Sequence, residues 1–493
     1  MPGAAARERA VVITGSLTLV FTAWGLGCVQ LWALHTLLFG SACTFALSII
    51  PLTRNWNGTD GQHGNVQNFK RLLEFPVFWL GLLFLIYIGI QGMNPSWVQV
   101  KGENGWWVEE LSAVSWLPSG VRADYQSMNA FRVMASFSAA HLLVCGLWIG
   151  LRRRKSVLRV LWIFSISGFL MAVLAILQKF TGADAVYWRI PSPNPSFWGT
   201  FFYRNEATIY LTLVITATAT LYFYYFKQVE RRGRSSGPHL LVFFFVVVIY
   251  TSIALALSRG GILFGGVVTA AFLSTVIFSL LYSPTIMKSV PLILITIILL
   301  GSCGYVAFNE IDVDAIKKRF GDVEETILNA DKDSRVITTK VTWEMAQEKL
   351  WYGWGAGSWR YIFPMYQKSY PEIYYQRYDQ KRGWLGRRVY HYAHNDVVQF
   401  LCEYGIIGCS LLLLIFAYWI GCLLFRASEQ PLGAFMLMVG MIMALCHAFV
   451  DFVFQNPANW LVLNAVICLC IKIFMLDTKR RKLSKRMEWG VRY

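Results

Sequence analysis

Two histidines stand where a long polar segment gives way to an apolar one, in the stretch His391-Tyr-Ala-His394-Asn-Asp396. Histidine exchanges a proton near neutral pH, so this junction predicts proton-transfer chemistry. His391 and His394 are three residues apart and could also bind a metal ion. No cysteine, Asp-x-Asp pair or third ligand is spaced to complete such a site, so we expect neither a metal ion nor another cofactor.

Two arginines also stand at the edges of apolar segments. Arg204 lies in Gly199-Thr-Phe-Phe-Tyr-Arg-Asn-Glu206, and Arg259 lies in Leu257-Ser-Arg-Gly-Gly261. Either side chain could simply reach the lipid headgroups as an interfacial anchor. A guanidinium also matches phosphate oxygens in a bidentate way. If both arginines meet His394 on one membrane face, they suit a diphosphate ligand, and the glycines after Arg259 would allow a tight turn and a close approach of backbone to that ligand.

The composition is that of a polytopic membrane protein. Of the 493 residues, 56% are apolar and 15% are charged, and the mean hydropathy is +0.46. The net charge of +17 is explained by anchoring to anionic membrane lipids, so we expect no nucleic-acid partner. The ten cysteines all fall in apolar runs and are interpreted as small buried side chains, not as disulfides.

Apolar runs of about 20 residues predict an all-α fold with about twelve membrane-spanning helices. We place them near 10–28, 30–50, 76–93, 130–150, 157–178, 205–226, 239–257, 260–282, 289–307, 395–425, 431–453 and 459–476. Basic clusters fall on alternate connections, which by the positive-inside rule puts both termini in the cytoplasm. Arg204, Arg259 and His394 then lie on the outer face.

This topology divides the chain into four parts. Residues 1–308 hold spans one to nine, 309–393 form a large external loop, 394–478 hold spans ten to twelve, and 479–493 form a basic cytoplasmic tail. Within the loop we expect helices over 312–328 and 338–350, followed by a turn at 353–357. Asn395 or Asp396 would cap the span that begins after His394.

Five short motifs resemble those of the O-antigen ligase and O-antigen polymerase superfamily. The histidine motif His394-Asn-x9-Gly405-Ile-Ile-Gly408 is similar to the family's His-Asn/Ser-x9-Gly-x-x-Gly pattern. The order and spacing agree from about residue 199 to 457, and the first 198 residues match only in hydropathy. The other four motifs are Ser258-Arg-Gly-Gly261, the segment 199–206 with departures at Tyr203 and Glu206, the large-loop segment Trp343…353–358, and His447-x3-Asp451-Phe452…Pro457.

The resemblance implies a membrane-embedded glycosyltransferase of the type C fold. It also implies a donor, a glycan carried on undecaprenyl diphosphate. Arg204 and Arg259 match the family's essential arginines and would hold the diphosphate. His394 matches its essential histidine and would take a proton from the acceptor hydroxyl, with inversion at the anomeric carbon and no metal. Possible supporting residues are Asn395, which like a neighbouring carboxylate could orient the imidazole, Arg335, which matches a looser family arginine, and His391.

The possible glycosyltransferase activities differ in the acceptor that receives the glycan. A ligase uses lipid A–core, a polymerase uses another lipid-linked repeat unit, and related transferases use a protein. The His-Asn-x9-Gly-x-x-Gly spacing favours a ligase, whereas Cys409-Ser410 replaces the Thr-Thr of ligases. An alternative from a different functional class is a lipid-linked glycan transporter or flippase. Such a protein would carry its charged groups near the membrane midplane, between inverted repeats. We expect a multi-pass protein of the bacterial inner membrane with a periplasmic active site.

Overall fold

The computed structural model describes residues 2–50, 67–103, 105–234, 236–282, 294, 333–379 and 383–490. Within these residues ten helices are long and apolar enough to cross a membrane, so the predicted all-α polytopic fold is confirmed. They are α2 (Leu31–Ile49), α4 (Pro76–Met93), α5 (Ala130–Gly150), α6 (Arg154–Phe180), α7 (Arg204–Arg231), α8 (Pro238–Leu255), α9 (Arg259–Leu281), α15 (Asp396–Arg426), α16 (Pro431–Ala448) and the first part of α17 (Pro457–Gly490).

Ten of the twelve predicted spans coincide with these helices. The first falls on α1 (Pro2–Trp24), which is helical but is not among the ten, and which leads into the short η1 (Leu26–Cys28). The predicted span 289–307 and the predicted loop helix 312–328 lie outside the described residues. The total of twelve spans therefore stays a prediction.

The long connections also contain short strands that the sequence reading missed. Strands β1 (Pro95–Gly102), β2 (Gly105–Glu110) and β3 (Gly120–Arg122) form a sheet in the order β2-β1-β3, with β1 antiparallel to β2 and parallel to β3. Two hairpins pair β4 (Ala185–Val186) with β5 (Ile190–Pro191) and β6 (Tyr375–Asp379) with β7 (Gly383–Arg387). Strand β2 is exposed along almost its whole length, so it lacks the apolar alternation by which strands are recognised.

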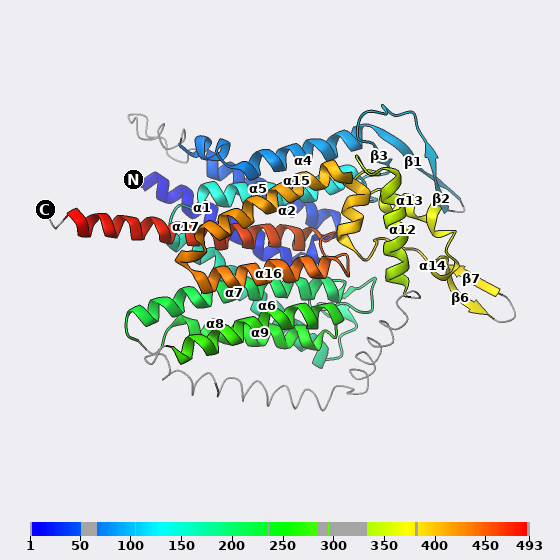
Figure 1. Cartoon of the computed structure of the whole chain (residues 1–493). Helices are drawn as coiled ribbons and strands as arrows, with labels where there is room; N and C mark the ends of the chain where they lie inside the picture. Colours follow the sequence, from blue (N-terminus) through cyan, green and yellow to red (C-terminus); the bar gives the residue numbers. More distant parts are fainter. Residues whose placement is uncertain are drawn as a thin grey trace.

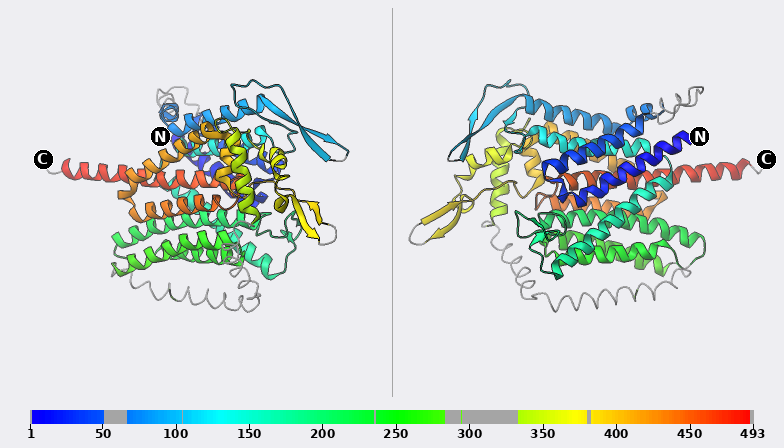
Figure 2. Two further views of the ribbon diagram at one scale, coloured as in Figure 1. Left: turned by 45° about the vertical axis from the view of Figure 1, so that its right-hand side comes forward. Right: turned by 180° about the vertical axis from the view of Figure 1, so that it is seen from behind.

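The spanning helices lie side by side, and most of the loop elements gather at one end of them (Figure 1). This end carries α12 (Ser334–Glu348), α13 (Trp359–Gln367), α14 (Pro371–Tyr374) and the strands β1–β3 and β6–β7. We call it the loop end. Both chain termini lie at the opposite end, as the two further views also show (Figure 2).

Helix α7 is the central helix, with 94% of its most apolar window buried. The hydroxyls of Thr208, Thr212 and Thr216 each donate to a backbone carbonyl three or four residues earlier in α7, so burying these hydroxyls costs little. Glycines from neighbouring helices pack against these threonines: a Cβ on Gly261 would lie 2.5 Å from Thr208 Cβ, and one on Gly440 would lie 2.2 Å from Thr216 Oγ1. Small residues thus let α9 and α16 approach α7 closely.

Helix α15 is broken at Gly405, where φ is 61° and ψ is −172°. The next two amides find acceptors outside the helix: Ile406 N donates to Leu350 O at 2.8 Å and Ile407 N to Trp351 O at 3.2 Å, at the end of α12. A Cβ on Gly405 would lie 2.4 Å from Trp351 O, so the loop can dock only onto a glycine. The continuous span predicted over 395–425 is therefore interrupted, and its break anchors the large loop.

The break predicts an unequal response to two glycine substitutions in α15. We expect Gly405→Ala to lower the melting temperature of the detergent-purified protein by several degrees or to abolish folding. The left-handed backbone costs an alanine about 1–2 kcal/mol, and the new methyl would overlap the docked loop. Thermal unfolding followed by tryptophan fluorescence measures the effect.

Gly421→Ala is the matched control, because nothing lies within 4 Å of the Cβ position at Gly421. Its melting temperature should equal or exceed that of the wild type, since alanine is the better helix former. Equal melting temperatures for the two variants would show that the break is not under steric constraint.

Candidate active site

The three residues singled out in the sequence lie together at the loop end. Arg204 is the first residue of α7, Arg259 is the first residue of α9, and His394 precedes α15 by two residues. Arg204 is half-buried, Arg259 is exposed, and the side chain of His394 is 22% exposed.

A hydrogen bond between Ser258 and Asn205, the chain neighbours of Arg259 and Arg204, holds the starts of α9 and α7 together. Ser258 Oγ donates to Asn205 Oδ1 at 2.7 Å and accepts from Gly261 N at 3.1 Å, so it also caps α9. The glycines after Arg259 were expected to make a tight turn, and that expectation is wrong because both lie in the first turn of α9, whereas their approach to a ligand stays a prediction. Leu257 makes the turn, with φ at 51°. Gly261 instead packs against α7, because only a residue without a side chain fits there.

The backbone around His394 is held on both sides. His394 has φ at 55°, a left-handed conformation that is unusual outside glycine and asparagine. Ala393 N donates to Gln399 Oε1 at 2.9 Å, and Asp396 N donates to the backbone oxygen of Asp451 at 3.3 Å. The Asn395 side chain accepts from Val398 N at 3.1 Å and so caps α15. The Asn395 oxygen is thus engaged in capping, as predicted, and a role for Asn395 in orienting the imidazole stays a prediction.

A buried carboxylate lies at ion-pair distance from the imidazole, although the contact does not have the geometry of a hydrogen bond. Asp451 Oδ1 lies 3.4 Å from His394 Nδ1, and Asp451 is 1% exposed. Its other oxygen accepts from Asn205 Nδ2 and, at 3.4 Å, from the hydroxyl of Tyr203. Asp451 therefore joins His394 to the residue beside Arg204, and through Ser258 to Arg259.

The charges around Asp451 keep it ionised. Burial by itself would raise the pKa of this carboxyl, but His394 and the positive charge of Arg335 outweigh burial and lower the pKa to about 2. Arg335 stands in the first turn of α12, where Asp333 caps the helix. The structure thus brings Arg335 within electrostatic reach of the site, on the large loop.

Aromatic rings form one wall of the site. Phe452 lies between Tyr203 and Tyr392, with ring centroids 5.1 and 4.8 Å away, and it meets His394 edge-on at 4.8 Å. Burial, and then the charge of Asp451, raise the pKa of Tyr203, so its phenol stays neutral and serves as a donor. The imidazole of His394 thus contacts the Asp451 carboxylate and the Phe452 ring.

The loop between α16 and α17, residues 449–456, is pinned by two further carboxylates. Asp396 Oδ2 accepts from Phe454 N at 2.7 Å, and Glu206 Oε2 accepts from Asn456 Nδ2 at 2.9 Å. Both carboxylates are buried. They hold the loop against α15 and α7, which fixes Asp451 relative to His394.

His391 lies apart from this network. No hydrogen bond or ion pair joins it to His394 among the described residues. Partial burial and then the charge of Arg360 lower the pKa of His391, so it is neutral at physiological pH. Within the same described ranges, no group of three or more His, Cys, Asp or Glu side chains could hold a metal ion.

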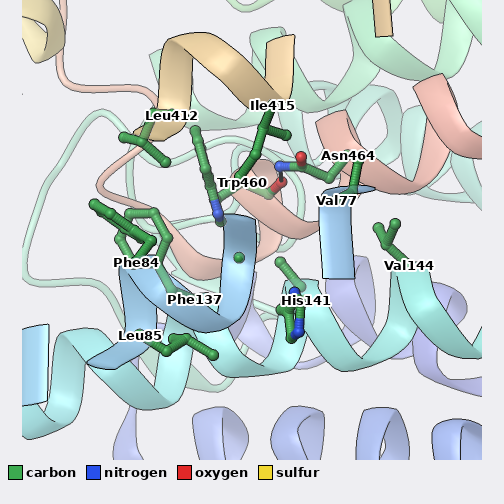
Figure 3. A pocket seen from close by; sticks show the side chains of 12 residues that line it. Val77, Phe84, Leu85, Phe137, His141, Val144, Leu412, Ile415, Trp460 and Asn464 are labelled. Carbon is green, nitrogen blue, oxygen red and sulfur yellow. Dashed lines mark hydrogen bonds between the residues drawn. The ribbon is translucent and has the colours of Figure 1, made fainter. Parts of the chain in front are cut away.

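A small pocket elsewhere in the bundle contains none of the site residues. It lies between α4, α5, α15 and α17, has a volume of about 40 Å³ and is lined mainly by apolar side chains (Figure 3). His141 and Asn464 are the polar residues that line it. The site described above borders solvent at the loop end instead.

Sequence reasoning missed three residues of the network: Asp451, Asn205 and Ser258. Each one stood inside a motif that was quoted for its other residues. A signal was available for Asp451, because a lone carboxylate at the end of an apolar helix requires a partner. Its partner is not visible in the sequence, because His394 is 57 positions away.

Comparison with known proteins supports the motif-based assignment. Residues 243–413 match the family model described as O-antigen ligase. The match runs from α8 to the middle of α15, so it includes Arg259, Arg335 and His394, whereas Arg204 and Asp451 lie outside it. A search of curated proteins finds no match.

Proposed function

We propose that this chain, which carries an O-antigen ligase family domain at residues 243–413, is an inverting glycosyltransferase that moves a glycan from undecaprenyl diphosphate to a sugar hydroxyl of lipid A–core. One observation carries the proposal: at the loop end the buried carboxylate of Asp451 contacts both His394 and Asn205, the chain neighbour of Arg204, and Asn205 in turn bonds Ser258, the chain neighbour of Arg259. That arrangement provides a base and an anion grip in one accessible region.

The arginines act on the donor. Arg204 and Arg259 would bind the diphosphate oxygens and offset the charge that develops as the anomeric carbon–oxygen bond breaks. The bonding electron pair leaves with undecaprenyl diphosphate. Since guanidinium groups supply the positive charge, the proposed reaction proceeds without a metal ion or other cofactor.

His394 acts on the acceptor. An ionised carboxylate 3.4 Å from Nδ1 favours the tautomer that carries its proton on that nitrogen, which leaves Nε2 as the proton acceptor. Nε2 takes the proton of the acceptor hydroxyl while its oxygen attacks the anomeric carbon from the side opposite the diphosphate. The anomeric configuration is therefore inverted.

The orientation in the membrane follows from the two ends of the bundle. The loop end carries the site and would face the periplasm of a bacterial inner membrane. The opposite end carries both termini and the basic residues Arg152, Arg153 and Arg154, which suits the cytoplasmic side. Undecaprenyl diphosphate would reach Arg204 and Arg259 from the surrounding lipid.

The function is tested with purified protein in detergent, with EDTA present and no ion gradient. Wild-type protein should transfer glycan from lipid-linked donor to lipid A–core. Arg259→Lys should reduce kcat/KM for the donor at least about tenfold, because one lost charge-assisted hydrogen bond is worth about 1.5–3 kcal/mol. Product is measured by gel shift of the labelled lipid A–core.

Arg122→Lys is the control, since Arg122 is exposed on β3 at the same end of the bundle and makes no contact with the site. Full activity of Arg259→Lys would contradict the diphosphate grip. A wild-type protein that consumes donor only when another lipid-linked repeat unit is the acceptor would be a polymerase. One that consumes no donor in detergent would not be a glycosyltransferase.

A further inference from the structure

A second pair of basic residues stands at the loop end, on the other side of His394 from Arg204 and Arg259. Arg132 lies in the first turn of α5, and Arg360 is the second residue of α13. The two guanidiniums are close enough for their charges to interact. The Phe452 ring separates them from the first pair, because it stacks on Tyr392, which Arg360 covers, and on Tyr203, which precedes Arg204. The two arginine pairs therefore flank the Phe452 ring that meets His394.

Arg360 is connected to His394 through aromatic rings. Its guanidinium carbon lies 5.1 Å from the centre of the Tyr392 ring. Tyr392 stacks on Phe452 at 4.8 Å, and Phe452 meets His394 at 4.8 Å. Three successive contacts of about 5 Å thus link the guanidinium to the proposed base. A glycan of a few sugar residues can span three such contacts.

The positive charge of this pair is not neutralised by the described residues. Arg132 donates to two backbone oxygens, Val29 O at 2.7 Å and Gln126 O at 2.8 Å, and neither arginine forms an ion pair with a carboxylate in the described ranges. Glu403 is within electrostatic reach of Arg360. Its carboxylate, however, is buried and already accepts from Gly357 N and Gln399 Nε2.

Like charges held together raise the free energy of the protein unless an anion binds beside them. The surroundings also suit a carbohydrate, since Trp106, which is 39% exposed, packs edge-on against Tyr361 at 5.7 Å, and Tyr361 lies within electrostatic reach of Arg132. Rings of this kind stack on sugars, and guanidiniums bind phosphate or carboxylate groups. Both features point to a glycan that carries negative charge.

We propose that Arg360, with Arg132 behind it, binds an anionic group of the acceptor glycan and so positions the acceptor hydroxyl at His394. This inference rests on the proposed function, because it assigns the second substrate of that reaction. The donor diphosphate is held by one arginine pair and the acceptor phosphate or carboxylate by the other. The acceptor is therefore an acidic glycan, not a neutral repeat unit.

Equilibrium binding in the absence of donor tests this assignment. The probes are phosphorylated lipid A–core, the same glycolipid after phosphatase treatment, and the same glycolipid after reduction of its carboxyl groups. We expect Arg360→Ala to weaken binding of the untreated probe about tenfold, the loss of one charge-assisted interaction. The weakening should disappear for whichever treated probe lacks the recognised group. Arg360→Lys, which keeps the charge, should bind with intermediate affinity.

Arg387→Ala is the matched control. Arg387 lies in the same loop and also stands over a tyrosine ring, that of Tyr374 at 5.7 Å. It should bind every probe like the wild type. Arg132 is unsuitable as the first variant, because its two backbone hydrogen bonds give it a structural role.

Equal binding of the untreated probe by Arg360→Ala and wild type would overturn the assignment. So would a loss of the same size for all three probes, or no binding of any probe. The two proposals fail separately. Charge-dependent binding through Arg360 without glycan transfer would refute the glycosyltransferase alone, and transfer without dependence on Arg360 would refute the acceptor site alone.

Discussion

His394→Ala is expected to reduce kcat for glycan transfer about 10²–10⁴-fold, the usual contribution of a positioned general base. Donor affinity should stay within about twofold of the wild type, because Arg204 and Arg259 hold the diphosphate and alanine leaves them in place. We expect kcat to fall because Asp451 orients the imidazole as the base in the proposed mechanism, and alanine supplies no base in its place. Transfer is measured with saturating donor and acceptor, and donor affinity by equilibrium binding.

His35→Ala is the control for this variant. His35 is exposed, lies far from α15 in the sequence and is hydrogen-bonded to the hydroxyl of Tyr125 at 2.9 Å. Its kcat should equal that of the wild type. Wild-type turnover by His394→Ala would remove the histidine from the mechanism, and loss of donor binding would show that it belongs to the diphosphate grip instead.

Asp451→Asn is expected to reduce kcat at least about 10²-fold while the protein stays folded. An amide has nearly the same shape as the carboxylate but no charge, so it neither favours the Nδ1–H tautomer nor stabilises the imidazolium that forms. The new asparagine would also face Asn205 Nδ2 with an uncharged amide group. Asn205 would thereby lose its charged hydrogen-bond acceptor. The KM for donor should change little, because both arginines remain.

Asp477→Asn is the control for a lost buried carboxylate. Asp477 lies at the opposite end of the bundle, where it pairs with Arg154 at 3.1 Å and accepts from Gln430 at 2.6 Å. Asp477→Asn should lower the melting temperature about as much as Asp451→Asn does, without a comparable loss of kcat. If the two variants lose activity in proportion to their stability, Asp451 has a structural role only.

Isolated charges made the site residues visible in the sequence. Arg204, Arg259 and His394 stand out because apolar segments surround them, and the positive-inside rule placed them on one face. The network that joins them was not visible, because it depends on contacts such as that between Asn205 and Asp451, which are 246 positions apart. Pattern and composition report which residues face lipid. They carry no information on which polar side chains meet.

The helix break shows the same limit in another form. The motif Gly405-Ile-Ile-Gly408 was quoted as a resemblance, but apolar periodicity predicted an unbroken span through it. Two amides after Gly405 are satisfied by the carbonyls of Leu350 and Trp351, so the break forms only when the large loop is present. A local pattern cannot predict a hydrogen bond that is supplied by a segment 56 residues earlier in the chain.

Tyr203 shows that a departure from a family pattern can be built into the site. At this departure from the resembled pattern, the tyrosine hydroxyl reaches Asp451 at 3.4 Å and the ring stacks on Phe452 at 5.1 Å. The substitution therefore strengthens the wall that confines His394. The second departure, Glu206, is equally engaged through its contact with Asn456.

Single-turnover transfer by donor-loaded protein tests the central claim most directly. Wild-type, His394→Ala and Asp451→Asn proteins are loaded with labelled lipid-linked donor to equal occupancy in EDTA, and lipid A–core is then added. We predict rapid formation of product with inverted anomeric configuration by the wild type, and retention of bound, intact donor by both variants. Equal rates of donor cleavage by all three proteins, or retained anomeric configuration in the wild-type product, would contradict the mechanism.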